Sequence, residues 1–302
     1  MTPLRLFAAL ILFCSCQVFV LGKSSADLPD MKLKVEITKS GYVGQPIEYR
    51  VLLTSNSSNI QDVRAVRNPS VSPDCQIVRG RVTNQKPVVE TINGQKIFTW
   101  TILRNFIIAK APGKYEIGEG DFIAYLPFER IVDDFFWGRR RVVDYEEVPL
   151  KCEKVSFKVS DLPKNKPENF SDAVGQFSVD GWFPPGEIRV GNEAIVVLKI
   201  EGYGNLENLK LPNVAKSFVN GCSLVNIERN DAMSQKNGSL YSEVTLTCTF
   251  IPRSTDGEID PVSFVFFNPD SKKYETVNSK PLQWNVNNKK KERKPSYDVM
   301  EI

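Results

Sequence analysis

Apolar residues alternate with polar ones along most of this chain, and this period of two constrains the fold more than any other feature. Such runs, or short β-branched apolar runs, recur as MKLKVEIT, PIEYRVLLTS, KIFTWTILRNFIIA, KVSFKVS, AIVVLKIEG, YSEVTLTCTFI and PVSFVFF. Dipeptides typical of tight turns separate them, at Asn93-Gly94, Pro112-Gly113, Asn237-Gly238 and Asp256-Gly257. Past residue 22 no stretch of a dozen residues carries a helical stripe. The pattern predicts stacked antiparallel sheets and disfavours a nucleotide-binding βαβ fold.

The alternating segments fall into two copies of one pattern. GYVGQPIEYRVLL corresponds to IRVGNEAIVVLKI, and TWTILRNFIIAKAPGKYEIGEGDFIAY corresponds to TLTCTFIPRSTDGEIDPVSFVFF. Both pairs are offset by about 145 residues, which suits a repeated module of β-sandwich size. We therefore predict two tandem immunoglobulin-like β-sandwich modules, at 28–160 and 173–286. A linker rich in proline, asparagine and charge, 161–172, joins them, and a charged, disordered tail, 287–302, follows.

The first 22 residues have the form of an export signal peptide. A short basic start, MTPLR, precedes an apolar run at 6–22. A membrane-spanning anchor is the competing interpretation, because the run approaches spanning length. Cys16, late in the run, also suggests a lipid attachment site, which would hold the mature chain at a membrane. The sequence thus predicts an exported protein of the periplasm or cell envelope.

The composition removes several classes of function. The chain has no histidine, which excludes Ser-His-Asp and Cys-His nucleophile pairs, a histidine base and imidazole zinc sites. The 39 lysines and arginines nearly balance the 36 acidic residues, so no strong field favours nucleic acid. Carboxylate-pair glycosidases and lysine-based mechanisms remain open. Because the sequence shows no catalytic constellation, we predict a binding protein that is not an enzyme and uses no cofactor or metal.

Four cysteines follow the signal peptide: Cys75, Cys152, Cys222 and Cys248. In an oxidising compartment they could form two disulfides, and four cysteines allow three pairings that the sequence alone cannot distinguish. Of these we favour the pairing with one disulfide in each module. The alternative is that Cys248, in step with apolar neighbours on one strand face, is a small buried hydrophobic residue. No CxxC spacing supports a metal or redox site.

Gly202, Gly204 and Asn205 directly follow an alternating strand and could be taken for a phosphate-binding loop. Such a loop needs a helix directly after the glycines, and the segment ENLKLPNV, with Pro212 in it, leaves no room for one. We therefore predict structural turn residues at a sheet edge, where glycine supplies a positive φ or room for close backbone approach.

Three motifs occur in a fixed order in the second copy. An Ala-Val-Gly-x-Phe start lies in PENFSDAVGQFSVDGWF, and a Gly-x-Gly-Asn-Leu motif follows the next strand. The finish carries Pro252, Ile259, Pro261, Phe264, Phe266, Phe267, Pro269 and Tyr274. In this order the motifs resemble the periplasmic region of BatD, the oxygen-tolerance family of bacteria. The first copy is also similar, so the resemblance covers residues 28–286.

The resemblance implies an exported, non-enzymatic adaptor or scaffold of a cell-envelope complex, linked to aerotolerance or envelope stress. It also implies membrane partners that carry von Willebrand A domains. No catalytic residue is carried over, because none is established for the family. Family members commonly continue into a transmembrane helix, whereas this chain ends in NNKKKERKPSYDVMEI without an apolar span. A membrane anchor of the family's kind is therefore not expected, and the remaining routes to a membrane are a partner or a lipid.

Two aromatic loops are candidate binding surfaces. The segment DDFFWGRRR, 133–141, predicts an exposed loop that binds a protein partner, with six candidate contact residues: Phe135, Phe136, Trp137, Arg139, Arg140 and Arg141. The alternatives are that Phe135 and Trp137 fold back on the sheet, or that the loop contacts a membrane surface. The second loop is GWFPPGE, 181–187, in which Trp182 and Phe183 could stack on a sugar ring. A carbohydrate-binding surface module is therefore the second hypothesis. The alternative is that these residues close the end of a sandwich, as such residues more often do.

The phenylalanines Phe264, Phe266 and Phe267 occupy both faces of one predicted strand. At least one of them must point away from the core of its own sheet. That residue could support contact between the two modules.

Overall fold

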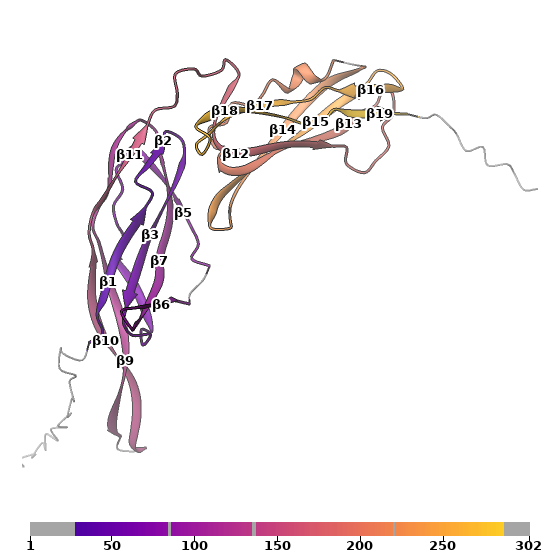
Figure 1. Cartoon of the computed structure of the whole chain (residues 1–302). Coiled ribbons are helices and arrows are strands. Elements are labelled where there is room, and N and C mark those ends of the chain that lie inside the picture. The colour runs from indigo at the N-terminus through magenta and orange to yellow at the C-terminus, as the bar shows by residue number, and fades with distance from the viewer. Residues whose placement is uncertain (1–27, 84–85, 135–136, 220, 287–302) are drawn as a thin grey trace, which may run out of the picture.

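The computed structural model describes residues 28–83, 86–134, 137–219 and 221–286. These residues are almost wholly β-strand, which confirms the predicted all-β sandwich fold (Figure 1). All seven segments expected from their alternation form strands. The predicted signal peptide, with Cys16, and the predicted tail lie outside the described residues.

The first group of strands, which we call module 1, forms three sheets around one core. The first sheet has the strand order β1-β3-β7-β5, and β6 also pairs with β7. The other two sheets have three strands each, in the orders β10-β9-β4 and β2-β11-β8. Each sheet buries one face, and Tyr49, Phe122 and Phe157 meet from the three sheets. The strands are β1 (Met31–Ile37), β2 (Ser40–Tyr42), β3 (Pro46–Ser55), β4 (Asp62–Arg67), β5 (Cys75–Arg79), β6 (Val88–Ile92), β7 (Gln95–Ala109), β8 (Gly113–Ile117), β9 (Gly120–Asp134), β10 (Gly138–Cys152) and β11 (Val155–Ser160).

The second group, module 2, has a six-stranded sheet in the order β14-β15-β13-β12-β17-β18 and a two-stranded sheet, β16-β19. The ring of Phe250 on β15 packs on Trp284 of β19, with centroids 5.5 Å apart, so the small sheet covers the large one. The elements are β12 (Phe170–Trp182), β13 (Ala194–Asn205), a 3-10 turn η2 (Val214–Ser217), β14 (Cys222–Lys236), β15 (Ser239–Pro252), β16 (Asp256–Ile259), β17 (Ser263–Asn268), β18 (Lys273–Asn278) and β19 (Leu282–Asn285).

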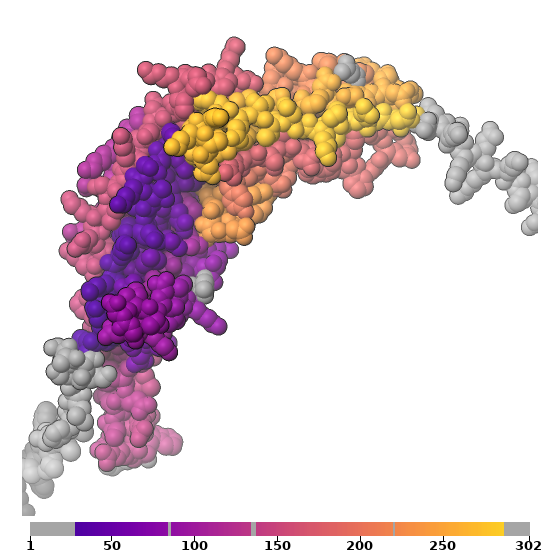
Figure 2. Space-filling model, in the orientation of Figure 1, coloured from indigo at the N-terminus to yellow at the C-terminus, as the bar shows by residue number. Residues whose placement is uncertain are grey.

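The two modules meet at a bend, as Figure 2 shows. The ring of Tyr42 from module 1 packs edge-on against Phe267 of β17, with centroids 4.9 Å apart. Leu240, at the tip of the β14–β15 hairpin, packs against Phe106 and Ile108 of β7. The expectation from the phenylalanine run is confirmed, because one member of the run, Phe267, leaves the core of its own module.

The linker is shorter than the sequence predicted. Strand β12 begins at Phe170, inside the predicted linker 161–172, because this buried side chain pairs opposite Val265 of β17. Asp172 has a φ of 61° and forms ion pairs with Lys166 and Lys210, at 2.8 and 2.7 Å. The connection between the modules is therefore 161–169.

Two of the four predicted turn dipeptides are turns, and in a third Pro112 precedes β8 while Gly113 is the first residue of that strand. Asn93-Gly94 and Asn237-Gly238 both have left-handed φ angles and close two-residue hairpins, and Pro112-Gly113 leads from β7 into β8. The prediction for Asp256-Gly257 was wrong, because both residues lie within β16. There the glycine provides space for an aromatic ring, since a Cβ would lie 2.0 Å from Trp284.

No helix in the described part of the chain is long and apolar enough to cross a membrane.

Candidate protein-interaction site

A two-stranded arm projects from module 1. Strands β9 and β10 pair in register over their full length, from Gly120 opposite Cys152 to Asp134 opposite Gly138. Strand β4 pairs with β9 only as far as Tyr125, so among the described residues no third strand pairs with the distal part of the hairpin. Figure 1 shows this part extending past the rest of module 1. We call residues 129–134 and 137–145 the β9–β10 arm.

The arm exposes several apolar side chains to solvent, and this exposure does not stabilise the fold of the isolated chain. Ile131, Val143 and Tyr145 lie on one face of the two-stranded ladder, because side chains alternate between faces and Val143 is diagonal to Ile131 in the register. Ile131 is 53% exposed and Val143 is 59% exposed. Trp137, beside the turn, is 79% exposed, so it does not fold back on the sheet. Phe135 and Phe136 lie outside the described residues.

The arginines of the arm divide between its two faces. Arg139 and Arg141 share the face of Ile131, while Arg140 lies on the opposite face. The guanidinium of Arg141 is 3.4 Å from the Glu129 carboxylate, and both side chains are largely exposed. An exposed pair of this kind contributes only about 0–1 kcal/mol. Replacing the Glu129 carboxylate by a carboxylate of a partner protein therefore costs Arg141 little free energy.

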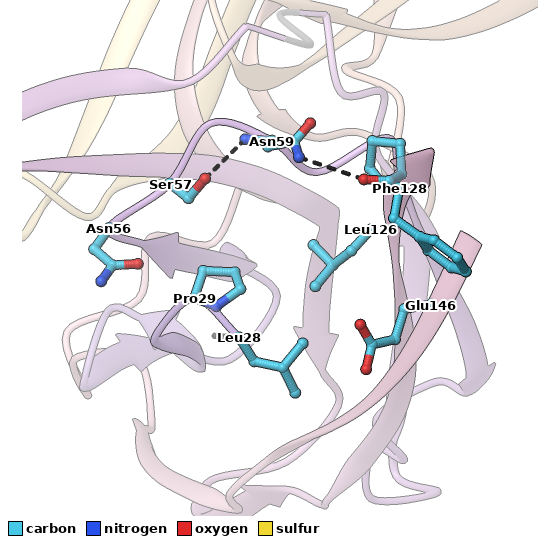
Figure 3. A pocket seen from close by; sticks show the side chains of 9 residues that line it. Leu28, Pro29, Asn56, Ser57, Asn59, Leu126, Phe128 and Glu146 are labelled. Carbon is cyan, nitrogen blue, oxygen red and sulfur yellow. Dashed lines mark hydrogen bonds between the residues drawn. The ribbon is translucent and has the colours of Figure 1, made fainter. Parts of the chain in front are cut away.

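The base of the arm borders a cavity of about 330 Å³ (Figure 3). Leu126, Phe128 and Glu146 line it from the hairpin, opposite Leu28 and the loop after β3. In that loop Asn59 donates a side-chain hydrogen bond to the Pro127 carbonyl, at 3.5 Å. Among the described residues that line the cavity, Glu146 is the only carboxylate. A glycosidase needs two convergent acids, so this cavity lacks that chemistry.

The glycine motif lies inside a strand and not in a turn, which corrects the prediction for Gly202 and Gly204. Both belong to β13, which lies between β12 and β15 in the middle of the sheet. A Cβ on Gly202 would be 2.0 Å from the Gln176 carbonyl oxygen, and Gly204, with φ +154°, faces the Phe177 ring. Close approach of β12 therefore requires the glycines. Asn205 ends the strand, and its side chain accepts the backbone N–H of Glu207 at 3.0 Å.

The four described cysteines are buried free thiols. Cys222 pairs opposite Pro252, four residues along β15 from Cys248, which separates them by about 13 Å. A disulfide requires Cα atoms within about 7 Å, so the predicted pair in module 2 is excluded. Burial raises the pKa of the Cys248 thiol to about 11 and also raises the pKa values of Cys75, Cys152 and Cys222. These thiols are accordingly unreactive and structural.

The second aromatic loop divides into a buried and an exposed residue. Phe183 packs on Phe250 in the module 2 core, with ring centroids 6.0 Å apart, as expected for a residue that closes a sandwich. Trp182 is 41% exposed at the end of β12. It lies opposite Val197 of β13.

No protein-family model matches the chain, and no curated protein matches it. Within the described ranges no cluster of three acidic or cysteine side chains is placed to hold a metal ion. The sequence made Trp137 and the arginines candidate contact residues, and the structure adds the exposed Ile131, Val143 and Tyr145 to the same arm. The available signal was the alternation through 139–145, which places Val143 and Tyr145 on the same face as Arg139 and Arg141.

Proposed function

We propose that this chain is an exported, non-enzymatic adaptor that binds a protein partner in the cell envelope through the β9–β10 arm. The observation that supports this function is the exposure of Trp137, Ile131 and Val143 on a hairpin without a third strand. Tryptophan and arginine are the residues that most often dominate binding energy at protein interfaces. On the arm Arg139 and Arg141 share one face with the exposed apolar side chains of Ile131, Val143 and Tyr145.

The partner class follows from the resemblance to the BatD family, which implies membrane proteins with von Willebrand A domains. The charges on the arm support a protein partner of this kind. Arg139 forms no ion pair with a described residue, and Arg141 holds only the exposed Glu129. An acidic surface around an apolar depression is therefore the complementary shape and charge. A role in aerotolerance or envelope stress is part of the same proposal.

Affinity capture from detergent-solubilised cell envelope, with mass-spectrometric identification, tests this function. We expect the wild-type chain to recover a von Willebrand A-domain protein, and the Trp137→Ala/Arg141→Ala variant to bind it at least about 30-fold more weakly, as for interface hot spots. The matched control is Trp182→Ala/Arg189→Ala, which removes the same residue types from module 2. If no such protein is recovered with wild type, the partner class is wrong. Equal recovery with the arm variant would show that the arm is not the binding site.

A carbohydrate-binding surface module is the second candidate, and the exposure of Trp182 favours it. An exposed indole ring can stack on the apolar face of a sugar. Glycans that raised the melting temperature of wild type but not of Trp182→Ala would support this function. The same Trp182→Ala chain should retain the arm's partner, so the two functions are separable.

A further inference from the structure

A groove runs between two sheet edges in module 1, away from the tip of the arm. Strand β1 is the outer strand of one sheet and β10 is the outer strand of another. The two strands lie close together without pairing. Between them lies a cavity of about 930 Å³, lined by β1 and by the end of β10 with the residues that follow it. We call it the β1–β10 groove.

The floor of the groove is the uncovered margin of the module 1 core. Leu33 and Ile37 of β1, with Leu150 and Val155 across the groove, are only partly buried, yet they pack against the buried core cluster. Neither sheet extends far enough to cover them. Apolar side chains from an added segment would remove this area from water.

The β1 backbone is partly exposed on this side at Leu33 and Ile37, whereas Val35 between them is buried. The Asp30 carbonyl accepts a hydrogen bond from the backbone N–H of Asn56 on the β3 side, at 3.3 Å. Because antiparallel pairing alternates along a strand, the N–H and C=O groups of Leu33, Val35 and Ile37 then point away from β3, toward the groove. Strand β10 carries Pro149 there and lacks one donor. An added strand therefore pairs best with β1.

The rims of the groove are basic. Five lysines line it against two glutamates: Lys32, Lys34, Lys39, Lys151, Lys154, Glu36 and Glu153. One glutamate, Glu36, is already paired with Arg50. Lys34, Lys39 and Lys154 form no ion pair with any described residue. The groove therefore attracts acidic side chains.

We propose that the β1–β10 groove binds an extended acidic segment of a partner protein, which adds to β1 as an extra strand. Its apolar side chains cover the core margin, and its acidic side chains, at alternate positions, face the lysines. A second copy of β1 would bring Lys32 and Lys34 of both chains together, so charge opposes self-association through this edge. The chain's own KKKERK segment carries the wrong sign. This surface is independent of the arm and of its partner.

Fluorescence anisotropy with the chain from residue 23 tests the proposal. The probe is a labelled, end-capped nonapeptide in which valine alternates with glutamate. One control peptide has lysine in place of glutamate, and another is N-methylated at alternate backbone nitrogens. The protein variant is Lys34→Glu/Lys154→Glu, matched by Lys216→Glu/Lys273→Glu on module 2, which changes net charge equally.

We expect the acidic peptide to bind wild type and the module 2 control, and to bind the groove variant about tenfold more weakly. Amide hydrogen exchange should slow at Leu33 and Ile37 in the complex, which side-chain attraction alone would not produce. Absence of peptide binding, or equal binding of the N-methylated or lysine peptide, would overturn the proposal. So would equal affinities for both protein variants. Phosphatidylglycerol vesicles are the last arm, and binding to vesicles without peptide binding would assign the lysines to a lipid surface instead.

Discussion

The contact between Tyr42 and Phe267 predicts an energetic coupling between the two modules. The Phe267 ring is fully buried, although it projects from β17 away from the core of module 2. It packs 4.9 Å from the Tyr42 ring and 5.4 Å from the Tyr274 ring. The perturbation is Tyr42→Ala and Phe267→Ala, made singly and together.

The magnitudes follow from burial and ring geometry. Removing the buried Phe267 ring should lower the free energy of unfolding by about 3–5 kcal/mol. Tyr42 is only partly buried, so its removal should cost less, about 1–3 kcal/mol. Edge-to-face aromatic pairs contribute about 0.5–1.5 kcal/mol beyond area burial. The double variant should therefore lose less than the sum of the two single variants, by about 0.5–1.5 kcal/mol.

Urea unfolding, followed by circular dichroism and intrinsic fluorescence, measures this coupling in a double-mutant cycle. The control cycle pairs Tyr42→Ala with Phe264→Ala. Phe264 is also fully buried and lies on β17, but it faces the module 2 core and contacts Phe177 at 5.9 Å. Because Phe264 and Tyr42 do not share a contact, their effects should add within about 0.5 kcal/mol.

The control also defines the result that refutes the reasoning. If the Tyr42–Phe267 coupling is no larger than the Tyr42–Phe264 coupling, the modules do not use this aromatic contact in solution.

Two further predictions concern single residues. Gly204→Ala should lower the free energy of unfolding by about 2–4 kcal/mol, since a Cβ would lie 2.5 Å from the Phe177 ring and from the backbone of β12. The control is Gly94→Ala, in open space with φ +79°, which should lower it by only about 1–2 kcal/mol. Equal urea midpoints for the two variants would contradict the close approach. For Asp172, burial raises the pKa of the carboxyl, but hydrogen bonds from Lys166 and Lys210 outweigh it, so the folded pKa lies below the usual value. The ionised carboxylate thus stabilises the fold above the unfolded pKa of about 4, and this is lost as pH falls through the folded pKa. Asp172→Asn should lower stability by about 1 kcal/mol at pH 7, and the difference from wild type should shrink as pH falls below the unfolded pKa and through the lower folded pKa; a constant difference at all pH values would argue against the ion pairs.

The strands were predictable because alternation is a local property of the sequence. Strand β15 alternates buried and half-exposed or exposed residues along its whole length, and the pattern YSEVTLTCTFI is enough to predict it. The hairpins closed by Asn93-Gly94 and Asn237-Gly238 were predictable for the same reason, since the turn is determined by two residues with left-handed φ. The sequence also showed that the phenylalanine run must face in two directions.

The errors concern features that depend on residues distant in the sequence. The close backbone approach expected at Gly204 is confirmed, but it comes from Gly175 and Phe177 on the neighbouring strand within the sheet, and nothing near Gly204 in the sequence distinguishes that position from a turn at a sheet edge. The disulfide prediction for Cys222 failed because the β14–β15 register places the cysteine opposite Pro252. The β1–β10 groove depends on which strands lie at sheet edges, and single-sequence periodicity contains no such information.

The short connection between the modules determines how strong their contact has to be. Residues 161–169 tether Ser160 to Phe170, and so short a tether keeps the joined surfaces at an effective local concentration in the millimolar range. Contacts with affinities too weak to join separate molecules are therefore strong enough to keep the bend closed. Cutting the tether with a protease should let the halves drift apart on dilution, although every residue of the contact would still be present.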